Sequence, residues 1–146
     1  FNQIDYAFQR QRLMAALQRW NVTHCVAEQN AMGEPIIEQL QRDKIQIIGF
    51  ATTLTSKVAV IESLALELEK GTIQLQSDDT AKAELEAYER RTTASGLSTY
   101  SAPEGMHDDT VIARALMLKA MNEAPVRRRQ DQPVSRQYQE AVRTLL

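Results

Sequence analysis

The feature that most limits the fold of this chain is the alternation of short apolar runs with segments of helical period. Apolar, β-prone runs lie at residues 23–27, 45–50 and 72–75, and residues 92–101 alternate around a glycine as a strand or hairpin does. Segments with apolar residues at spacings of three and four lie between these runs. Because strands separated by helices pair mainly in parallel, the pattern predicts an α/β domain with at least some parallel strands.

Each predicted helical segment has an apolar face. The segments cover about residues 5–20, 35–42, 58–70, 79–90 and 111–121. Gly71 follows the third segment, at the position where glycine commonly ends a helix. Apolar residues spread widely around the last segment, which predicts that it packs into the core. Turns are expected at residues 30–33 and 103–105. We expect residues 1–123 to form one domain, and residues 124–146 to form a tail or a short helix.

The charge of the chain argues against general binding to nucleic acid, since the formal net charge is -2. Contact with DNA would depend on metal ions that offset the carboxylates, or on a local patch such as Arg127–Arg129, which is also typical of a solvated tail. The single cysteine, Cys25, excludes an intrachain disulfide and is expected to be a buried thiol in a reducing, intracellular compartment. No apolar run is long enough to span a membrane.

Two groups of acidic residues stand where α/β domains often carry their chemistry. Glu28 follows the first predicted strand, and His107, Asp108 and Asp109 precede the apolar last helix. Ligand sites in open sheets collect at the carboxyl ends of strands. Carboxylates that meet from distant parts of a chain bind hard cations such as Mg²⁺, and two such ions stabilise both oxygens of a phosphodiester displacement. The pattern therefore favours a metal site for phosphodiester chemistry.

Helix capping is the alternative interpretation of these acids, because Asp before a helix commonly caps its first turn. The chain has a second doubled pair, Asp78–Asp79, before a charged helix, and we interpret that pair as a simple cap. Asp108 and Asp109 differ because the helix after them is predicted to be buried. Burial of that helix would draw its start towards the sheet.

Other polar residues near these acids have more than one interpretation. Glu28 by itself is also compatible with a solvated residue after a strand. His107 would orient a carboxylate or a water, contact phosphate, or form part of the cap. Lys57 lies at a helix start, where its charge is unfavourable, so it either extends into solvent or meets an anion such as phosphate. His24 is expected to be a packed or edge residue of a strand and not a ligand.

The motifs of several other chemistries are missing from the sequence. There is no glycine-rich phosphate loop followed by Lys-Ser or Lys-Thr, so the sequence carries no sign of a phosphate-loop ATPase. No set of Cys and His residues has zinc spacing. No Gly-x-Ser-x-Gly nucleophile turn is present.

Four blocks of the sequence, in this order and spacing, resemble the carboxy-terminal nuclease domain of tailed-phage terminase large subunits. The resemblance covers about residues 1–122, and its blocks lie at residues 26–33, 52–57, 71–75 and 100–109. The block that ends in His-Asp-Asp before an apolar helix is the most specific of the four. The Glu-x-Asn-x-x-Gly pattern in the first block supports it.

The resemblance implies a ribonuclease H-like fold, a mixed sheet flanked by helices, related to Holliday-junction resolvases and retroviral integrases. It implies an endonuclease that uses two Mg²⁺ or Mn²⁺ ions to cut concatemeric double-stranded DNA during genome packaging in the host cytoplasm. The implied partners are double-stranded DNA, the terminase small subunit and the portal.

The resemblance also assigns roles to particular residues. By position, Glu28 is the acid of the second strand, and Asp109 is the acid of the last helix and the favoured metal ligand. Asp108 is the second candidate ligand, and His107 is auxiliary. Lys57 would lie close to the site or to the DNA.

The sequence departs from this family where the first catalytic Asp is expected. Such domains begin with a central strand that carries this Asp, and nothing before Glu28 matches it, because Asp5 lies at the head of a predicted helix. We therefore expect the chain to lack its first strands and one metal ligand, and to cut DNA weakly or not at all without an upstream segment. Two alternatives are a non-catalytic ribonuclease H-like module that docks in the packaging motor, and a resolvase-like nuclease acting on branched DNA.

Overall fold

The structure of the chain is a computed structural model, which describes residues 6–32, 34–76 and 78–124. The expectations for Asp5, for Arg127–Arg129 and for a carboxy-terminal tail or helix lie outside the described residues. The elements in chain order are α1 (Tyr6–Arg19), β1 (Cys25–Glu28), α2 (Gln29–Met32), α3 (Glu34–Arg42), β2 (Ile47–Phe50), α4 (Leu54–Glu69), α5 (Asp79–Ala87), β3 (Glu89–Thr92), β4 (Ser98–Ser101) and α6 (Asp109–Glu123).

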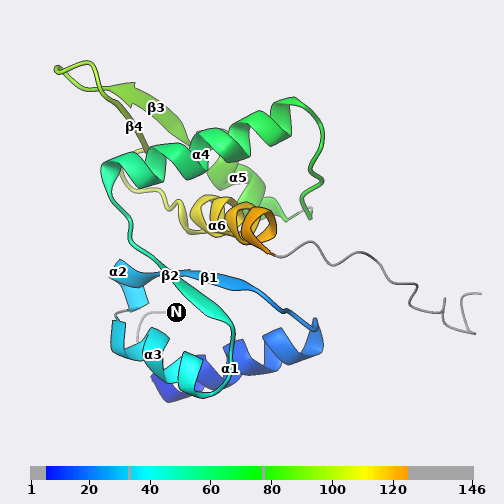
Figure 1. The fold of residues 1–146 in the computed structure, drawn as a ribbon. Coiled ribbons are helices and arrows are strands. Elements are labelled where there is room, and N and C mark those ends of the chain that lie inside the picture. The colour runs from blue at the N-terminus through cyan, green and yellow to red at the C-terminus, as the bar shows by residue number, and fades with distance from the viewer. Residues whose placement is uncertain (1–5, 33, 77, 125–146) are drawn as a thin grey trace, which may run out of the picture.

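The strands form two small sheets. β1 and β2 pair in parallel, with Cys25 opposite Ile47 and Glu28 opposite Phe50, so the predicted parallel pairing is confirmed. β3 and β4 form an antiparallel hairpin that projects from the body of the molecule (Figure 1). A strand or hairpin was predicted over residues 92–101. The hairpin is confirmed, and it begins at Glu89.

Helix α6 occupies the middle of the molecule. It lies between α4 and α5 on one side and the β1–β2 sheet on the other, and α1 and α3 lie beyond that sheet (Figure 1). This position confirms the prediction that the last helix packs into the core. An α/β architecture with helices on both faces of a parallel strand pair follows from it.

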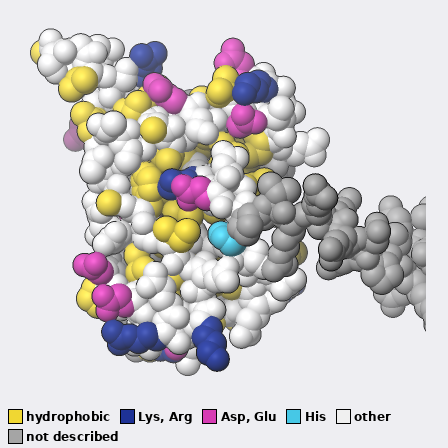
Figure 2. Space-filling model, viewed as in Figure 1, with side chains coloured by type: hydrophobic (Ala, Val, Ile, Leu, Met, Phe, Trp, Pro, Cys, Tyr) yellow, Lys and Arg dark blue, Asp and Glu magenta, His cyan; other side chains and the backbone are white. Residues whose placement is uncertain are grey.

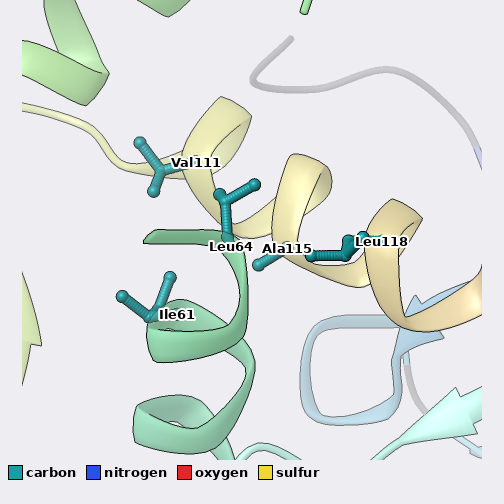
Figure 3. Close-up of a cluster of buried hydrophobic side chains, with 5 residues drawn as sticks. All are labelled: Ile61, Leu64, Val111, Ala115 and Leu118. Carbon is teal, nitrogen blue, oxygen red and sulfur yellow. The ribbon is translucent and has the colours of Figure 1, made fainter. Parts of the chain in front are cut away.

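Two apolar clusters hold these layers together. The larger cluster joins α4 to α6 through the side chains in Figure 3, which are Ile61, Leu64, Val111, Ala115 and Leu118. The smaller cluster, Ile37, Leu40 and Ile47, joins α3 to β2. The half-buried Cys25 packs against it, and burial raises the pKa of its thiol. Among the described residues, no helix is long and apolar enough to cross a membrane.

Several element boundaries differ from the sequence-based expectations, and helix α4, for example, begins at Leu54 and not near residue 58. Residues 72–76 form no strand, because Ile73 packs against the α4–α6 cluster and does not join a sheet. Helix α5 ends at Ala87 and not near residue 90, since Tyr88 is extended and leads into β3. The turn expected near residue 30 is in part the short helix α2, which begins directly after Glu28.

Leu64→Ala should lower the free energy of unfolding by about 2–5 kcal/mol, because it opens a cavity between α4 and α6. Leu64 is 2% exposed, whereas Leu66 of the same helix is 47% exposed. Leu66→Ala is therefore the matched control, with an expected change within about 0.5 kcal/mol. Urea unfolding followed by circular dichroism measures both changes, and equal losses would contradict this assignment of the core.

Candidate functional site

The groove between β1 and α6 shows how the two candidate acid groups are placed. Residues 21–26 line one side of it, and Ala113, Met117, Ala120 and Met121 line the other. The carboxyl half of α6 therefore lies beside the amino half of β1, and the two elements run in opposite directions (Figure 1). As a result, the last residue of β1 and the first residue of α6 lie at the same end of their contact.

The candidate residues at this end differ in exposure. Glu28 and Asp108 are half-buried, whereas His107 and Asp109 are exposed. Within the described part of the chain, no three His, Cys, Asp or Glu side chains gather closely enough to hold a metal ion. The described residues thus supply separate acids at one end of the fold and not a closed metal cage. His24 is half-buried at the amino end of β1, away from the Glu28 end.

The block of residues 52–57 is attached to the segment that follows Glu28. The Asn30 side-chain amide donates to the Thr52 carbonyl at 2.9 Å, and the Thr52 N–H donates to Asn30 Oδ1 at 3.3 Å. Thr53 then caps α4, and its side chain accepts from the Ser56 N–H while the Ser56 hydroxyl accepts from the Thr53 N–H. These contacts place the start of α4 next to the carboxyl end of β1.

The two doubled Asp pairs of the sequence behave differently. The Asp78 side chain accepts from the Ala81 N–H at 2.9 Å and caps α5, as predicted for that pair. Asp108 occupies the same position before α6, but its side chain makes no capping hydrogen bond. The capping interpretation therefore holds for Asp78 and not for the carboxylate of Asp108.

The Asp108 carboxylate instead meets Lys57, which lies 51 positions earlier in the chain. Lys57 Nζ is 3.0 Å from Asp108 Oδ2, and the two side chains are 25% and 28% exposed. Burial lowers the pKa of the Lys57 ammonium, but the hydrogen bond to Asp108, the interaction with Tyr88 and the charge of Asp108 together outweigh this effect, so that pKa lies above its ordinary value. Of the two behaviours expected for Lys57, the structure shows contact with an anion, and the anion is a carboxylate of the site.

A pair of tyrosines forms the wall beside this ion pair. The Lys57 ammonium lies 5.9 Å from the centre of the Tyr88 ring, within the range of a cation–π contact. The Tyr88 ring stacks on Tyr100 with 6.4 Å between ring centres. Burial raises the pKa of the Tyr88 hydroxyl, and the Lys57 charge acts in the opposite direction.

One acid of this region was not identified from the sequence. Glu84 of α5 is 8% exposed, and its carboxylate accepts from the Thr110 N–H at 2.8 Å and from the Thr110 hydroxyl at 2.5 Å. Ala81, Glu84 and Leu85 stand at helical spacing on the face of α5 that packs inward. In the sequence, the signal for this contact was the position of Glu84 within the apolar stripe of α5.

Comparison with known proteins agrees with this arrangement. Residues 1–120 match the family model of the terminase RNaseH-like domain. The chain is 31% identical over 116 residues to the terminase large subunits of Thermus phage G20c and Thermus virus P23-45, a match that covers 79% of this chain and 24% of each relative. The chain thus spans about a quarter of the length of those relatives.

Solved nuclease domains have the same fold as this chain. The large terminase nuclease of thermophilic phage G20c with bound magnesium matches with a TM-score of 0.72 at 29% identity, covering 84% of this chain and 64% of that one. The nuclease domain of the Thermus phage P74-26 large terminase matches with a TM-score of 0.68 at 29% identity, covering 80% of this chain and 60% of that one. The G20c nuclease was also solved with bound cobalt.

The fold therefore defines a ribonuclease H-like domain, similar to solved terminase nuclease domains. The chain belongs to the terminase RNaseH-like domain family, and its relatives are large subunits of phage terminases. The resemblance read from the four sequence blocks is confirmed, as is the ribonuclease H-like α/β fold.

Lys57→Met should lower the free energy of unfolding by about 1 kcal/mol, because it leaves the half-buried Asp108 carboxylate without its cation. The matched control is Lys82→Met, since Lys82 pairs with Glu86 at 3.7 Å and both side chains are about 70% exposed. That change should stay within about 0.5 kcal/mol. Denaturant unfolding at pH 7 measures both, and a Lys57→Met effect no larger than the control would show that the pair contributes nothing.

Proposed function

We propose that this chain carries the acids with which a phage packaging terminase cuts concatemeric double-stranded DNA in the host cytoplasm, Glu28 and Asp109 being the main metal ligands. The observation that carries the proposal is the shared position of these acids, at one end of the β1–α6 contact. Asp108 is the second ligand from α6, and His107 is auxiliary. Membership of the terminase RNaseH-like family supports the assignment.

The chemistry of these side chains suits Mg²⁺ or Mn²⁺. Hard divalent cations prefer carboxylate oxygens, together with water and substrate phosphate. Within the described ranges, no side chain forms an ion pair or a hydrogen bond with Glu28 or Asp109, whereas Asp108 is paired with Lys57. When bound, two such ions would stabilise charge on the phosphate oxygens during hydrolysis. The nuclease relative from G20c, solved with bound magnesium and with bound cobalt, supports divalent metal use.

Lys57 would balance charge at this site when DNA approaches. Its ammonium already neutralises Asp108, and a phosphate that enters the site would find the same cation within reach. On the face in Figure 2, Lys and Arg side chains lie at separate places with Asp and Glu side chains beside them. Because this face has no broad basic surface among the described residues, DNA binding would depend on local cations such as Lys57 and on metal ions.

The terminase small subunit and the portal are proposed protein partners, and they follow from family membership alone. We propose residues 1–123 as the nuclease part of the chain, consistent with the match to residues 1–120. The chain covers 66% of the G20c large terminase nuclease that it matches. A test of cleavage therefore uses the chain extended at its amino end to the length of that domain, called the amino-extended protein below.

Asp109→Ala in the amino-extended protein should reduce plasmid nicking with Mn²⁺ by at least about 100-fold. Removal of a metal ligand reduces activity more than removal of a residue that orients a ligand. Asp79→Ala is the matched control, since Asp79 also begins a helix in the sequence Asp-Asp-Thr. Gel quantification of nicked and linear plasmid over time measures the rates. If Asp109→Ala cuts as fast as the parent, Asp109 is not a ligand and the assignment is wrong.

A further inference from the structure

The first turn of α6 is capped in an unusual way. The first N–H groups of a helix have no partner within the helix, and the residue before it commonly accepts one of them. Asp78 does this for α5. At α6 the corresponding Asp108 side chain does not, and the Thr110 N–H is bound by Glu84, which lies 26 positions earlier on another helix.

The Glu84 carboxylate is well suited to this task. It is 8% exposed, and buried carboxylates are rare unless they have partners. One of its oxygens accepts both the N–H and the hydroxyl of Thr110, and it lies at the positive end of the α6 dipole. The contact therefore replaces the missing local cap with a buried, doubly hydrogen-bonded charge.

A second contact fixes α5 against α6 on the next turn. The Arg114 guanidinium donates to the Ala81 carbonyl at 3.1 Å and to the Gln76 carbonyl at 3.2 Å. With the Glu84–Thr110 contact, it ties the two helices together at two places. The position of Glu84 relative to the start of α6 is thus fixed by several hydrogen bonds and not by a single one.

The backbone of Asp108 shows the consequence. Asp78 and Thr53 cap their helices from an extended conformation, with ψ angles of 127° and 169°. Asp108 has φ -129° and ψ 16°, and its carboxylate lies against Lys57. The Asp108 side chain therefore does not cap α6. It remains available to the proposed metal site of Glu28, Asp108 and Asp109, which we call the acid site.

We propose that Glu84 is a positioning residue of the acid site, because by capping α6 it keeps Asp108 on Lys57 and holds Asp109 in place for a divalent cation. This inference rests on the proposed function for its metal-binding part. Glu84 caps the helix, so the carboxylates of Asp108 and Asp109 remain available for the acid site. Without Glu84, Asp108 would turn back to cap α6, as Asp78 caps α5.

The first experiment measures Mn²⁺ binding to the amino-extended protein by calorimetry. Glu84→Ala should weaken binding by about 10-fold or more, within the range seen when a residue behind a metal ligand is removed. Glu84→Gln keeps an oxygen that accepts from Thr110, and it should bind within about 3-fold of the parent if position and not charge is what Glu84 supplies. Asp78→Ala removes the matched cap of α5 and should leave Mn²⁺ affinity unchanged.

Two results of this titration would overturn the inference. Equal Mn²⁺ affinity in Glu84→Ala and Asp78→Ala, with both proteins folded by circular dichroism, would make Glu84 a structural cap only. Weakening by Glu84→Gln as great as that by Glu84→Ala would show that Glu84 acts through its charge and not by positioning.

The second experiment needs no metal, so it separates failure of this inference from failure of the proposed function. A double-mutant cycle of Lys57→Met and Asp108→Asn measures the coupling of the ion pair in urea unfolding. The coupling should be present in the parent and absent in a Glu84→Ala background, where Asp108 caps the helix instead. Coupling that survives Glu84→Ala would overturn the inference, whereas lost coupling in a protein that binds no Mn²⁺ would overturn only the metal assignment.

Discussion

Burial of α6 on two sides is the constraint on which the rest of the structure depends. Val111, Ala115 and Leu118 face α4 in the larger apolar cluster, and another side of the helix lies along β1. A helix that is apolar on more than one side can hide its surface only between two layers. The sheet, α4 and α5 are therefore arranged around it (Figure 1).

The same burial decides where the acids lie. Because α6 runs opposite to β1, packing of its apolar length brings its polar start to the end of the strand that carries Glu28. Helix α4 starts at that end too, since Asn30 binds Thr52, and Lys57 thereby reaches Asp108. The charged groups are thus placed by apolar packing, and their mutual attraction adds a smaller contribution.

Sequence patterns predicted the elements with strong periodicity and failed where tertiary contacts compete with local preference. The parallel strand pair, the hairpin and the buried last helix were predicted correctly. The strand expected at residues 72–75 is absent, because Ile73 contributes its apolar side chain to the α4–α6 cluster without pairing. Helix α5 ends early, because the Tyr88 ring packs against Tyr100 and Lys57.

The sequence alone determined the family, most of the helices and strands, and the identity of the candidate acids, because these depend on local periodicity and on short blocks of residues. It separated Asp78 from Asp108 only through the predicted burial of the helix that follows each of them, since both begin the same Asp-Asp-Thr. Only the tertiary structure decided that the Asp108 side chain makes no capping hydrogen bond and pairs with Lys57 instead. The physical reason is that Glu84 and Lys57 come from positions 26 and 51 residues away, which only packing around α6 brings to its first turn.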